Sequence, residues 1–351
     1  MVTRAKKAER IATIDLLRYM AALMVATYHW SLEIGRERAE QIYDVPIIGT
    51  LVANGAFGVP IFFIISGFVI IGAAQRYNSL EFAFARFNRL FPGLLICMLI
   101  ILPVGDRFIT SWQTPIPSFL NCIFLTWTLT GTSPLATQLW TLLVEVKFYA
   151  LVALVLLLST KILKNVRGIV LTLFLWEVVV IILQRTHTEF GTAILPYVNL
   201  QGQRSLFTIG ICFYLLTEAK LKFTGDYLLI CLTTLYFLYQ IFMVEFNTFI
   251  HHVSLLSVFL LILFSKYLNF GKRFQQISYW LGLSSYLIYL LHEHLGMAFI
   301  LQIQTRISQN VYIAFVLGSI FITVFSVLLA SFVEKPIQKY LANQFAKIYP
   351  H

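Results

Sequence analysis

The chain contains repeated runs of about twenty mainly apolar residues, and these runs limit what it can fold into. A helical run of this length matches the hydrocarbon core of a bilayer. Of the 351 residues, 59% are hydrophobic and only 12% are charged. A water-soluble domain of this size needs roughly a quarter of its residues charged. The sequence therefore excludes a soluble protein and predicts one that crosses the membrane many times.

Each run should be helical, because a backbone in lipid must satisfy its hydrogen bonds within its own segment. The predicted fold is all-α, a polytopic bundle of about ten transmembrane helices. A basic N-terminus (1–12) precedes the membrane domain (13–336), and a short tail (337–351) follows it. The apolar segment 118–130 is short and is predicted to be interfacial or re-entrant. The predicted crossings are 13–34, 48–74, 91–109, 137–159, 168–184, 197–216, 225–244, 251–265, 278–303 and 310–332.

Lys and Arg are distributed unequally between the two sides that these crossings define. With the N-terminus inside, eighteen of the 26 basic residues face the cytoplasm, five face outward and three fall within crossings. Because cytoplasmic loops carry an excess of Lys and Arg, this distribution places both termini in the cytoplasm. The net charge of +10 then reflects orientation and contact with anionic lipid rather than nucleic-acid binding.

The four cysteines are scattered through apolar segments, at Cys97, Cys122, Cys212 and Cys231. No two of them have the spacing of a metal site such as Cys-x-x-Cys. We therefore expect packing residues, and we expect no metal site.

Ionisable residues within the crossings are costly to bury and are candidates for function. In the first crossing, Arg18 and His29 are eleven residues apart. In a helix this spacing is about 16 Å along the axis and only about 20° around it. Both side chains should therefore face the same part of the bundle. A purely structural interpretation also exists, in which Arg18 reaches the inner headgroups and His29 is an ordinary interfacial histidine.

The fourth crossing carries Glu145 and Lys147, which are two residues apart. Residues at this spacing face different sides of a helix, so the two cannot pair with each other. Glu177 lies at a similar depth in the next crossing. We expect Lys147 and Glu177 to form a structural ion pair, which would turn Glu145 toward His29.

Two further groups of polar residues stand out. Tyr286, Tyr289 and His292 follow one another at a spacing of three and form a polar stripe on the ninth crossing. Such a stripe also suits hydrogen bonding between helices. Arg86 and Arg89, one helical turn apart on the cytoplasmic side, suit either a phosphate clamp or simple anchoring at the inner surface.

Six motifs in this order resemble the acyltransferase 3 family of bacterial membrane acyltransferases. They are IDLLRYMAALMVATYH (14–29), NGAFGVPIFFIISGFVI (54–70), FARFNRLFP (84–92), WTLLVEVKFY (140–149), SYLIYLLH (285–292) and FVEKP (332–336). One departure is that the family's Asp-Gly-Leu-Arg-Gly reads Asp-Leu-Leu-Arg-Tyr at 15–19. We expect no soluble SGNH-type esterase domain, so transfer would be direct or through a separate partner.

The resemblance implies a cytoplasmic acyl-CoA donor, commonly acetyl-CoA, and no permanently bound cofactor. Arg86 and Arg89 would bind the CoA phosphates, because paired guanidinium groups suit phosphate oxygens. The pantetheine arm would pass Arg18 and present the thioester near His29. An imidazole titrates near neutral pH and suits removal of the acceptor's proton. A transient acyl-histidine is the open alternative.

The acceptor that the resemblance implies is a hydroxyl of an extracytoplasmic glycan at the bacterial inner membrane. The glycan would be lipopolysaccharide, exopolysaccharide or a lipid-linked sugar. Glu145 would orient His29, as the carboxylate of a catalytic triad does. The polar stripe would bind substrate, or Tyr286 or His292 would donate to the thioester oxygen. Arg204 and the charged residues of 33–38 are candidates for the acceptor site, although solvated loop charge is the simpler interpretation of the latter.

Two other classes of function remain. A transporter, such as a flippase for a lipid-linked sugar, also needs many helices and buried charges. A non-catalytic assembly partner of a polysaccharide synthase is the structural alternative. The transporter does not account for the ordered motifs, or for a basic pair and a histidine at opposite ends of one route. Turnover of acyl-CoA by the purified protein would distinguish the enzyme from both.

Overall fold

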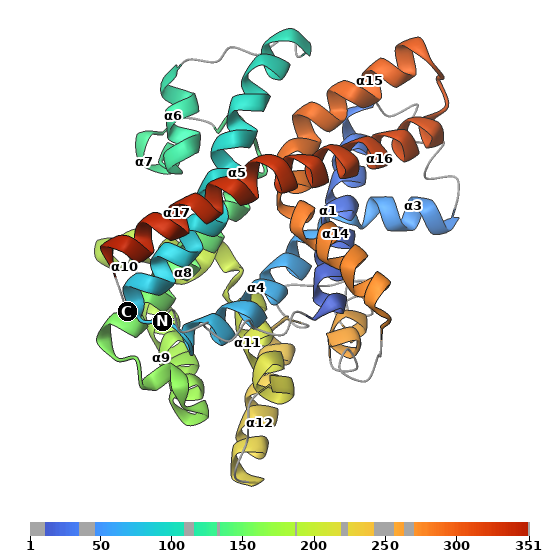
Figure 1. Cartoon of the computed structure of the whole chain (residues 1–351). Coiled ribbons are helices and arrows are strands. Elements are labelled where there is room, and N and C mark those ends of the chain that lie inside the picture. Colours follow the sequence, from blue (N-terminus) through green and yellow to red (C-terminus); the bar gives the residue numbers. More distant parts are fainter. Residues whose placement is uncertain are drawn as a thin grey trace.

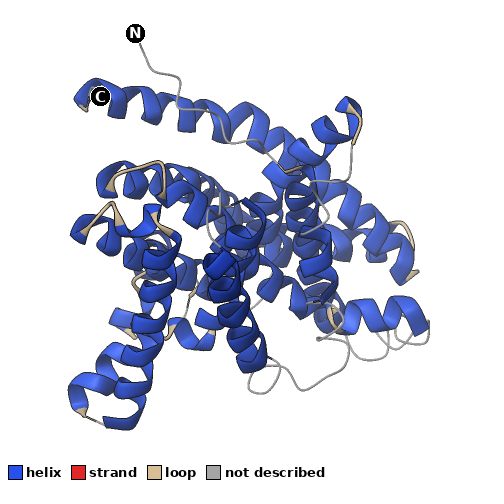
Figure 2. Cartoon of the chain, turned by 90° about the horizontal axis from the view of Figure 1, so that it is seen from below, coloured by secondary structure: helices blue, strands red, loops and turns tan. Residues whose placement is uncertain are grey.

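In the part of the chain that it describes, the computed structural model is all-helical and contains no β-strand. Figure 2 shows the described residues almost entirely as helix, with short loops and turns in the remainder of the described part. This confirms the all-α prediction. The described residues are 11–34, 46–108, 116–131, 134–186, 188–218, 224–241, 256–262 and 270–349.

Figure 1 shows how these helices are arranged, with α1, α4, α5 and α14 running through the middle of the bundle. The α-helices are α1 (Ala12–Glu33), α3 (Pro46–Ala53), α4 (Gly58–Ala74), α5 (Ser79–Phe108), α6 (Ile116–Phe124), α7 (Trp127–Thr130), α8 (Leu139–Leu158), α9 (Val166–Thr186), α10 (Glu189–Val198), α11 (Arg204–Glu218), α12 (Thr224–Gln240), α14 (Lys272–Leu291), α15 (Met297–Arg306), α16 (Val311–Leu329) and α17 (Lys335–Ile348). Short 3-10 turns are η1 (Gly55–Phe57), η2 (Ile162–Lys164) and η3 (Leu200–Gly202), and π-helical segments are η5 (His292–Gly296) and η6 (Ala330–Glu334).

Several helical runs are long and apolar enough to cross a bilayer, which confirms a multi-pass membrane protein. Within the described residues there are six: Gly55–Ala74, Ser79–Val104, Leu139–Leu158, Val166–Thr186, Lys272–Arg306 and Val311–Ile348. The helices α11 and α12 have only 15 and 17 residues. The predicted crossing 251–265 is described only at 256–262. The count of about ten crossings and the cytoplasmic position of both termini therefore stay predictions.

The helix α5 begins at Ser79, twelve residues before the predicted crossing at 91–109. A capping box explains this start: the Asn78 side chain accepts from the Glu81 amide at 2.9 Å, and the Glu81 carboxylate accepts from the Asn78 amide at 3.0 Å. Arg86 and Arg89 consequently lie on α5, one helical turn apart.

The short apolar segment 118–130 and the predicted tail 337–351 are both largely helical. Segment 118–130 forms α6 and α7, of nine and four residues, which are each too short to cross a bilayer. Most of the predicted tail 337–351 is α17, which packs along α5. The rings of Phe84 and Phe345 stack with centroids 3.9 Å apart, and Asn88 donates to the Gln338 carbonyl at 3.0 Å.

Glycines allow the central helices to approach closely, as small residues do at helix interfaces in membranes. A Cβ atom on Gly67 of α4 would lie 2.0 Å from the Phe207 carbonyl oxygen of α11. Its counterpart on Gly210 of α11 would lie 2.0 Å from the Ile64 carbonyl oxygen of α4. The helices α4 and α11 are thus in backbone contact, and this contact fixes the position of α4 within the bundle.

Candidate active site

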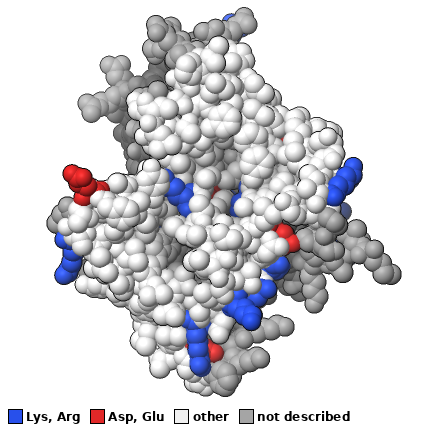
Figure 3. Space-filling model, turned by 90° about the vertical axis from the view of Figure 1, so that its left-hand side faces the viewer, with Lys and Arg blue, Asp and Glu red and all other residues white. Residues whose placement is uncertain are grey.

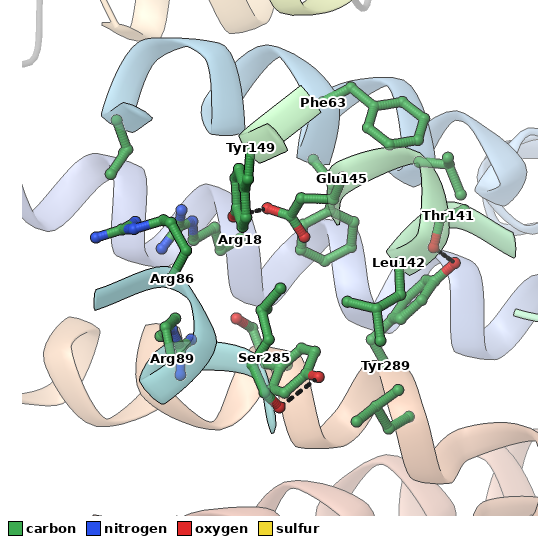
Figure 4. A pocket seen from close by; sticks show the side chains of 16 residues that line it. Arg18, Phe63, Arg86, Arg89, Thr141, Leu142, Glu145, Tyr149, Ser285 and Tyr289 are labelled. Carbon is green, nitrogen blue, oxygen red and sulfur yellow. Dashed lines mark hydrogen bonds between the residues drawn. The ribbon is translucent and has the colours of Figure 1, made fainter. Parts of the chain in front are cut away.

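A cavity of about 250 Å³ lies inside the bundle between α1, α4, α5, α8 and α14. Three arginines lie toward one end of this cavity, and the hydrogen-bonded pair Thr141 and Tyr289 lies at the other (Figure 4). We call this space the basic cavity. It is lined by Arg18, Val59, Phe62, Phe63, Val69, Arg86, Arg89, Leu90, Thr141, Leu142, Glu145, Tyr149, Ser285, Tyr286, Tyr289 and Leu290.

The structure brings the three sequence-predicted arginines, Arg18, Arg86 and Arg89, together at this cavity. In the space-filling view the surrounding surface is mostly uncharged, as a lipid-facing surface must be, while basic side chains appear inside a hollow near its centre (Figure 3). Two carboxylates, Glu145 and Glu334, lie beside the three guanidinium groups, and the charge of the buried Asp15 also acts on Arg18. The formal charges of the cluster therefore balance, and an anionic ligand would bind to a guanidinium group whose carboxylate neighbours leave it available.

Arg86 and Arg89 differ in how far their charge is already compensated. Arg89 Nη1 lies 3.4 Å from a carboxylate oxygen of Glu334, which is fully buried on η6. Arg86 lies over the rings of Phe82 and Tyr149, 5.7 and 5.9 Å from their centroids. Its buried Nε atom has no hydrogen-bond partner among the described residues. Arg86 is thus the arginine best able to accept a new anionic partner.

Glu145 belongs to the basic cavity. Its carboxylate accepts from the hydroxyl of Ser66 at 2.8 Å and from the hydroxyl of Tyr149. Figure 4 shows it turned toward Tyr149 and the arginine end. These partners differ from the expected one, because Glu145 was predicted to face His29, which lines a different cavity.

His29 lines a second cavity, of about 490 Å³, which we call the histidine cavity. Gly202 and Gln203 in the loop before α11 form part of its wall. That loop has an unusual backbone, because Leu200, Gln201 and Gly202 have φ of 51°, 55° and 89°. Non-glycine residues such as Leu200 and Gln201 rarely hold such angles, and residues with strained backbones cluster at functional sites. The histidine cavity is lined by Val25, His29, Ala56, Val59, Pro60, Trp140, Gly202 and Gln203.

His29 and His292 form a hydrogen-bonded pair between α1 and the start of η5. His292 Nε2 lies 3.1 Å from His29 Nδ1, and the ring centroids are 5.0 Å apart. His292 Nδ1 lies 2.7 Å from the carbonyl oxygen of Tyr289. Since a carbonyl only accepts, the Nδ1 atom of His292 carries a hydrogen and donates it to Tyr289.

This second hydrogen bond assigns the tautomer of the whole pair. His292 is 0% exposed, and burial in apolar surroundings favours the neutral imidazole. Its Nε2 atom therefore carries a lone pair and accepts from His29 Nδ1–H. A neutral His29 that donates from Nδ1 carries its own lone pair on Nε2. The arrangement thus leaves His29 Nε2 as the basic nitrogen.

The backbone at His292 is shaped to receive α1. The α-helix changes to the π-helical segment η5 at this residue, a distortion often found at functional sites. The Trp30 indole on α1 donates to the His292 carbonyl at 2.8 Å. A Cβ atom on Gly296 would lie 2.9 Å from the Trp30 ring, so only glycine fits there. Trp30 thereby fixes His29, its neighbour in sequence, against His292.

The three residues of the polar stripe have different surroundings. Tyr286 donates to the Leu90 carbonyl at 2.9 Å, and Tyr289 lies 2.8 Å from the Thr141 hydroxyl. Both line the basic cavity, whereas His292 contacts His29. The hydroxyl hydrogen of Tyr286 and the Nδ1 hydrogen of His292 are therefore both donated to backbone carbonyls. This geometry does not favour the expected donation from either residue to a thioester oxygen.

The expected ion pair between Lys147 and Glu177 was wrong. Glu177 pairs with Arg204 instead, with Arg204 Nη1 at 2.7 Å from one carboxylate oxygen and Nη2 at 3.1 Å from the other. Lys147 lies over the Tyr197 ring, 4.5 Å from its centroid. Arg204 and Glu177 are both largely buried. Arg204 does not line the histidine cavity, so its contacts indicate a structural ion pair rather than the expected acceptor site.

Of the charged residues at 33–38, the side chain of 33 and all of 35–38 lie outside the described residues. Among the residues that are described, no group of three His, Cys, Asp or Glu is arranged to hold a metal ion. Glu334 was not singled out from the sequence, although an acidic residue at the end of a long apolar run is a signal that could have found it.

The fold and the polar interior define a multi-pass integral membrane protein with a charged, ligand-sized cavity inside its helix bundle. The sequence model of the acyltransferase 3 family, described as an acyltransferase domain, matches residues 11–333. The chain therefore belongs to the acyltransferase 3 family, and it is a membrane acyltransferase, as its motifs indicated. Comparisons with curated proteins and with solved structures gave no match.

Proposed function

We propose that this protein is an O-acyltransferase that moves an acyl group, acetyl in the first place, from cytoplasmic acyl-CoA to a hydroxyl of an extracytoplasmic glycan. Its location would be the inner membrane of a bacterium. One observation carries the proposal: a basic cavity and a cavity that contains a histidine meet at Val59 inside one bundle. A group transfer between an anionic donor and a neutral acceptor requires such a pair of sites.

The donor end of the proposal rests on the arginines. CoA carries several phosphates, and guanidinium groups bind phosphate oxygens with two hydrogen bonds each. Arg86, with an unpartnered Nε, is the first candidate for these contacts, and Arg89 would exchange part of its contact with Glu334 for the ligand. The pantetheine arm would then run past Arg18 toward Tyr289, along the long axis of the basic cavity (Figure 4).

The chemistry would take place at His29. Its Nε2 atom removes the proton of the acceptor hydroxyl as the oxygen attacks the thioester carbonyl. The C–S bond then breaks, the acyl group stays on the acceptor oxygen, and the CoA thiolate takes the proton from His29. His292, rather than the predicted Glu145, would stabilise the His29 imidazolium by accepting from its Nδ1–H.

The acceptor would enter the histidine cavity. Trp140 in its wall offers a flat ring that suits the apolar face of a sugar, and Gln203 offers an amide for hydroxyl groups. The loop before Gln203 is held at both ends. Trp176 donates to the Val198 carbonyl at 2.8 Å, and Arg204 pairs with Glu177. A fixed loop of this kind would present Gln203 in one orientation.

Purified protein in nanodiscs with acetyl-CoA labelled in the acetyl group tests the proposal. We expect release of the free CoA thiol, and transfer of label when a glycan acceptor is added. A flippase for a lipid-linked sugar is the second candidate, because it also needs buried charge. Absence of thiol release from a folded protein, together with movement of a fluorescent lipid-linked sugar across the bilayer, would support the flippase and contradict the acyltransferase.

A further inference from the structure

Val59 is the only residue that lines both cavities in the part of the chain that the structure describes. It lies in the first turn of α4, immediately after Gly58, where that helix begins. The side chain is small, apolar and branched at Cβ, and it has few rotamers. Val59 is thus the residue at which the walls of the basic cavity and the histidine cavity coincide.

The backbone at Val59 is held against the helix that carries His29. A Cβ atom on Gly58 would lie 2.4 Å from the Ala21 carbonyl oxygen and 2.8 Å from the Val25 side chain. Helix α4 therefore touches α1 one to two turns before His29. The residue after Val59 is Pro60, whose ring fixes its own φ and so limits how the backbone can move here. Val59 cannot move away from α1 to make room for a larger ligand without disturbing this contact.

The reactive end of the basic cavity lies beside Val59. Phe62 follows Val59 by three residues, so both side chains face the same side of α4. The rings of Phe62 and Tyr289 are in edge contact with centroids 5.5 Å apart, and the Tyr289 ring lies 5.7 Å from that of His292. His292 in turn contacts His29. A thioester at this end of the cavity would have Val59 between it and the histidine cavity.

We infer that the Val59 side chain limits the length of the acyl group that the enzyme transfers. When the thioester carbonyl is within reach of His29, the carbon chain of the acyl group lies against the isopropyl group of Val59. An acetyl methyl fits this space, whereas each further methylene competes with the Val59 methyl groups. The inference rests on the proposed acyl-CoA chemistry and adds to it the residue that selects the donor.

The test compares acetyl-, propionyl- and butyryl-CoA by release of the CoA thiol in nanodiscs, with water as the acceptor. A single methylene in an apolar pocket changes kcat/KM by about tenfold to two-hundredfold. In Val59→Ala we expect the propionyl-to-acetyl ratio of kcat/KM to rise by about tenfold or more over wild type. In Val59→Ile we expect the ratio to fall, because the added methyl group fills the space.

Val69→Ala is the matched control, since Val69 is on the same helix and lines the basic cavity but not the histidine cavity. We expect its propionyl-to-acetyl ratio to equal that of wild type, whatever its overall rate. An unchanged ratio in both Val59 variants, or an equal change in Val69→Ala, would overturn the inference. If Val59→Ala does not fold, the ratio in Val59→Ile decides alone. Loss of thiol release from every donor in folded wild type would instead contradict the proposed function.

Discussion

His292 Nε2 lies 3.1 Å from His29 Nδ1 and accepts a hydrogen bond from it. The direction follows because the hydrogen of His292 is on Nδ1, which donates to the Tyr289 carbonyl. The pair therefore resembles the histidine and carboxylate of a catalytic triad in its logic, with a neutral imidazole in the carboxylate's place. His292 does not line either cavity and acts through His29. It is a positioning residue, and its two nitrogens have separable tasks.

Two substitutions separate these tasks. In His292→Asn the side-chain amide can still donate to the Tyr289 carbonyl, but nothing accepts from His29. In His292→Gln the side-chain oxygen can lie near the former Nε2 position and accept from His29. We expect His292→Asn to lower kcat for thiol release by about 10²-fold or more, with KM for acetyl-CoA little changed, and His292→Gln to retain a larger rate.

The control for this pair is the thermal unfolding temperature of both variants in detergent. A structural role alone would lower the unfolding temperature of the two variants and leave kcat of the folded protein equal. The same loss of kcat in both variants at equal stability would also contradict the assigned tautomer.

Arg86 gives the sharpest test of the donor site. A hydrogen bond to a charged group contributes about 1.5–3 kcal/mol, and each 1.4 kcal/mol is a tenfold change in affinity. We therefore expect Arg86→Ala to raise KM for acetyl-CoA by about tenfold or more. With acetyl-pantetheine, which lacks the nucleotide phosphates, the variant and wild type should have the same KM. An equal effect on both donors would mean that Arg86 does not bind these phosphates.

Arg89 and Glu334 link the donor site to η6, with 3.4 Å between Arg89 Nη1 and a Glu334 oxygen. Glu334 is 0% exposed, and removal of one partner of a buried pair leaves an uncompensated charge at a cost of about 3–5 kcal/mol. We expect Arg89→Met to lower the unfolding temperature strongly. Arg89→Met combined with Glu334→Gln should restore much of it. A double variant less stable than Arg89→Met would contradict this pairing.

Arg204 and Glu177 are expected to stabilise the fold without a part in the chemistry. Arg204→Met breaks the two contacts to Glu177 and should reduce the yield of folded protein, while kcat of the folded fraction stays near wild type. Lys147→Met is the comparison, because Lys147 contacts the Tyr197 ring and leaves no buried partner behind. A larger loss of yield in Lys147→Met than in Arg204→Met would revive the ion pair that the sequence suggested.

The sequence predicted the features that depend on position along one helix. The spacing of Arg18 and His29 put both on one face of α1, and they line adjoining cavities. Glu145 and Lys147 face different sides of α8, as expected. The early start of α5 was also readable, because Asn78 and Glu81 have the Asn-x-x-Glu spacing of a capping box.

Features that depend on which helices pack together could not be predicted. Lys147, Arg204 and Glu177 are all polar residues within or beside predicted crossings, and only the tertiary arrangement decides that Glu177 of α9 meets Arg204 at the start of α11. His29 and His292 are 263 residues apart in sequence. Their contact depends on a π-helical segment and on the Trp30 indole, and neither follows from hydrophobic periodicity. Val59 carries no polar signal and gains its role solely from its place between two cavities.

The central claim is that His29 performs acyl transfer from acyl-CoA, and thiol release by purified His29→Ala tests it most directly. The experiment uses wild type and His29→Ala in nanodiscs, at equal amounts of folded protein, with labelled acetyl-CoA. The expected result is that the variant binds acetyl-CoA as wild type does, while its thiol release falls by about 10²-fold or more. Thiol release at the wild-type rate from folded His29→Ala would contradict the account.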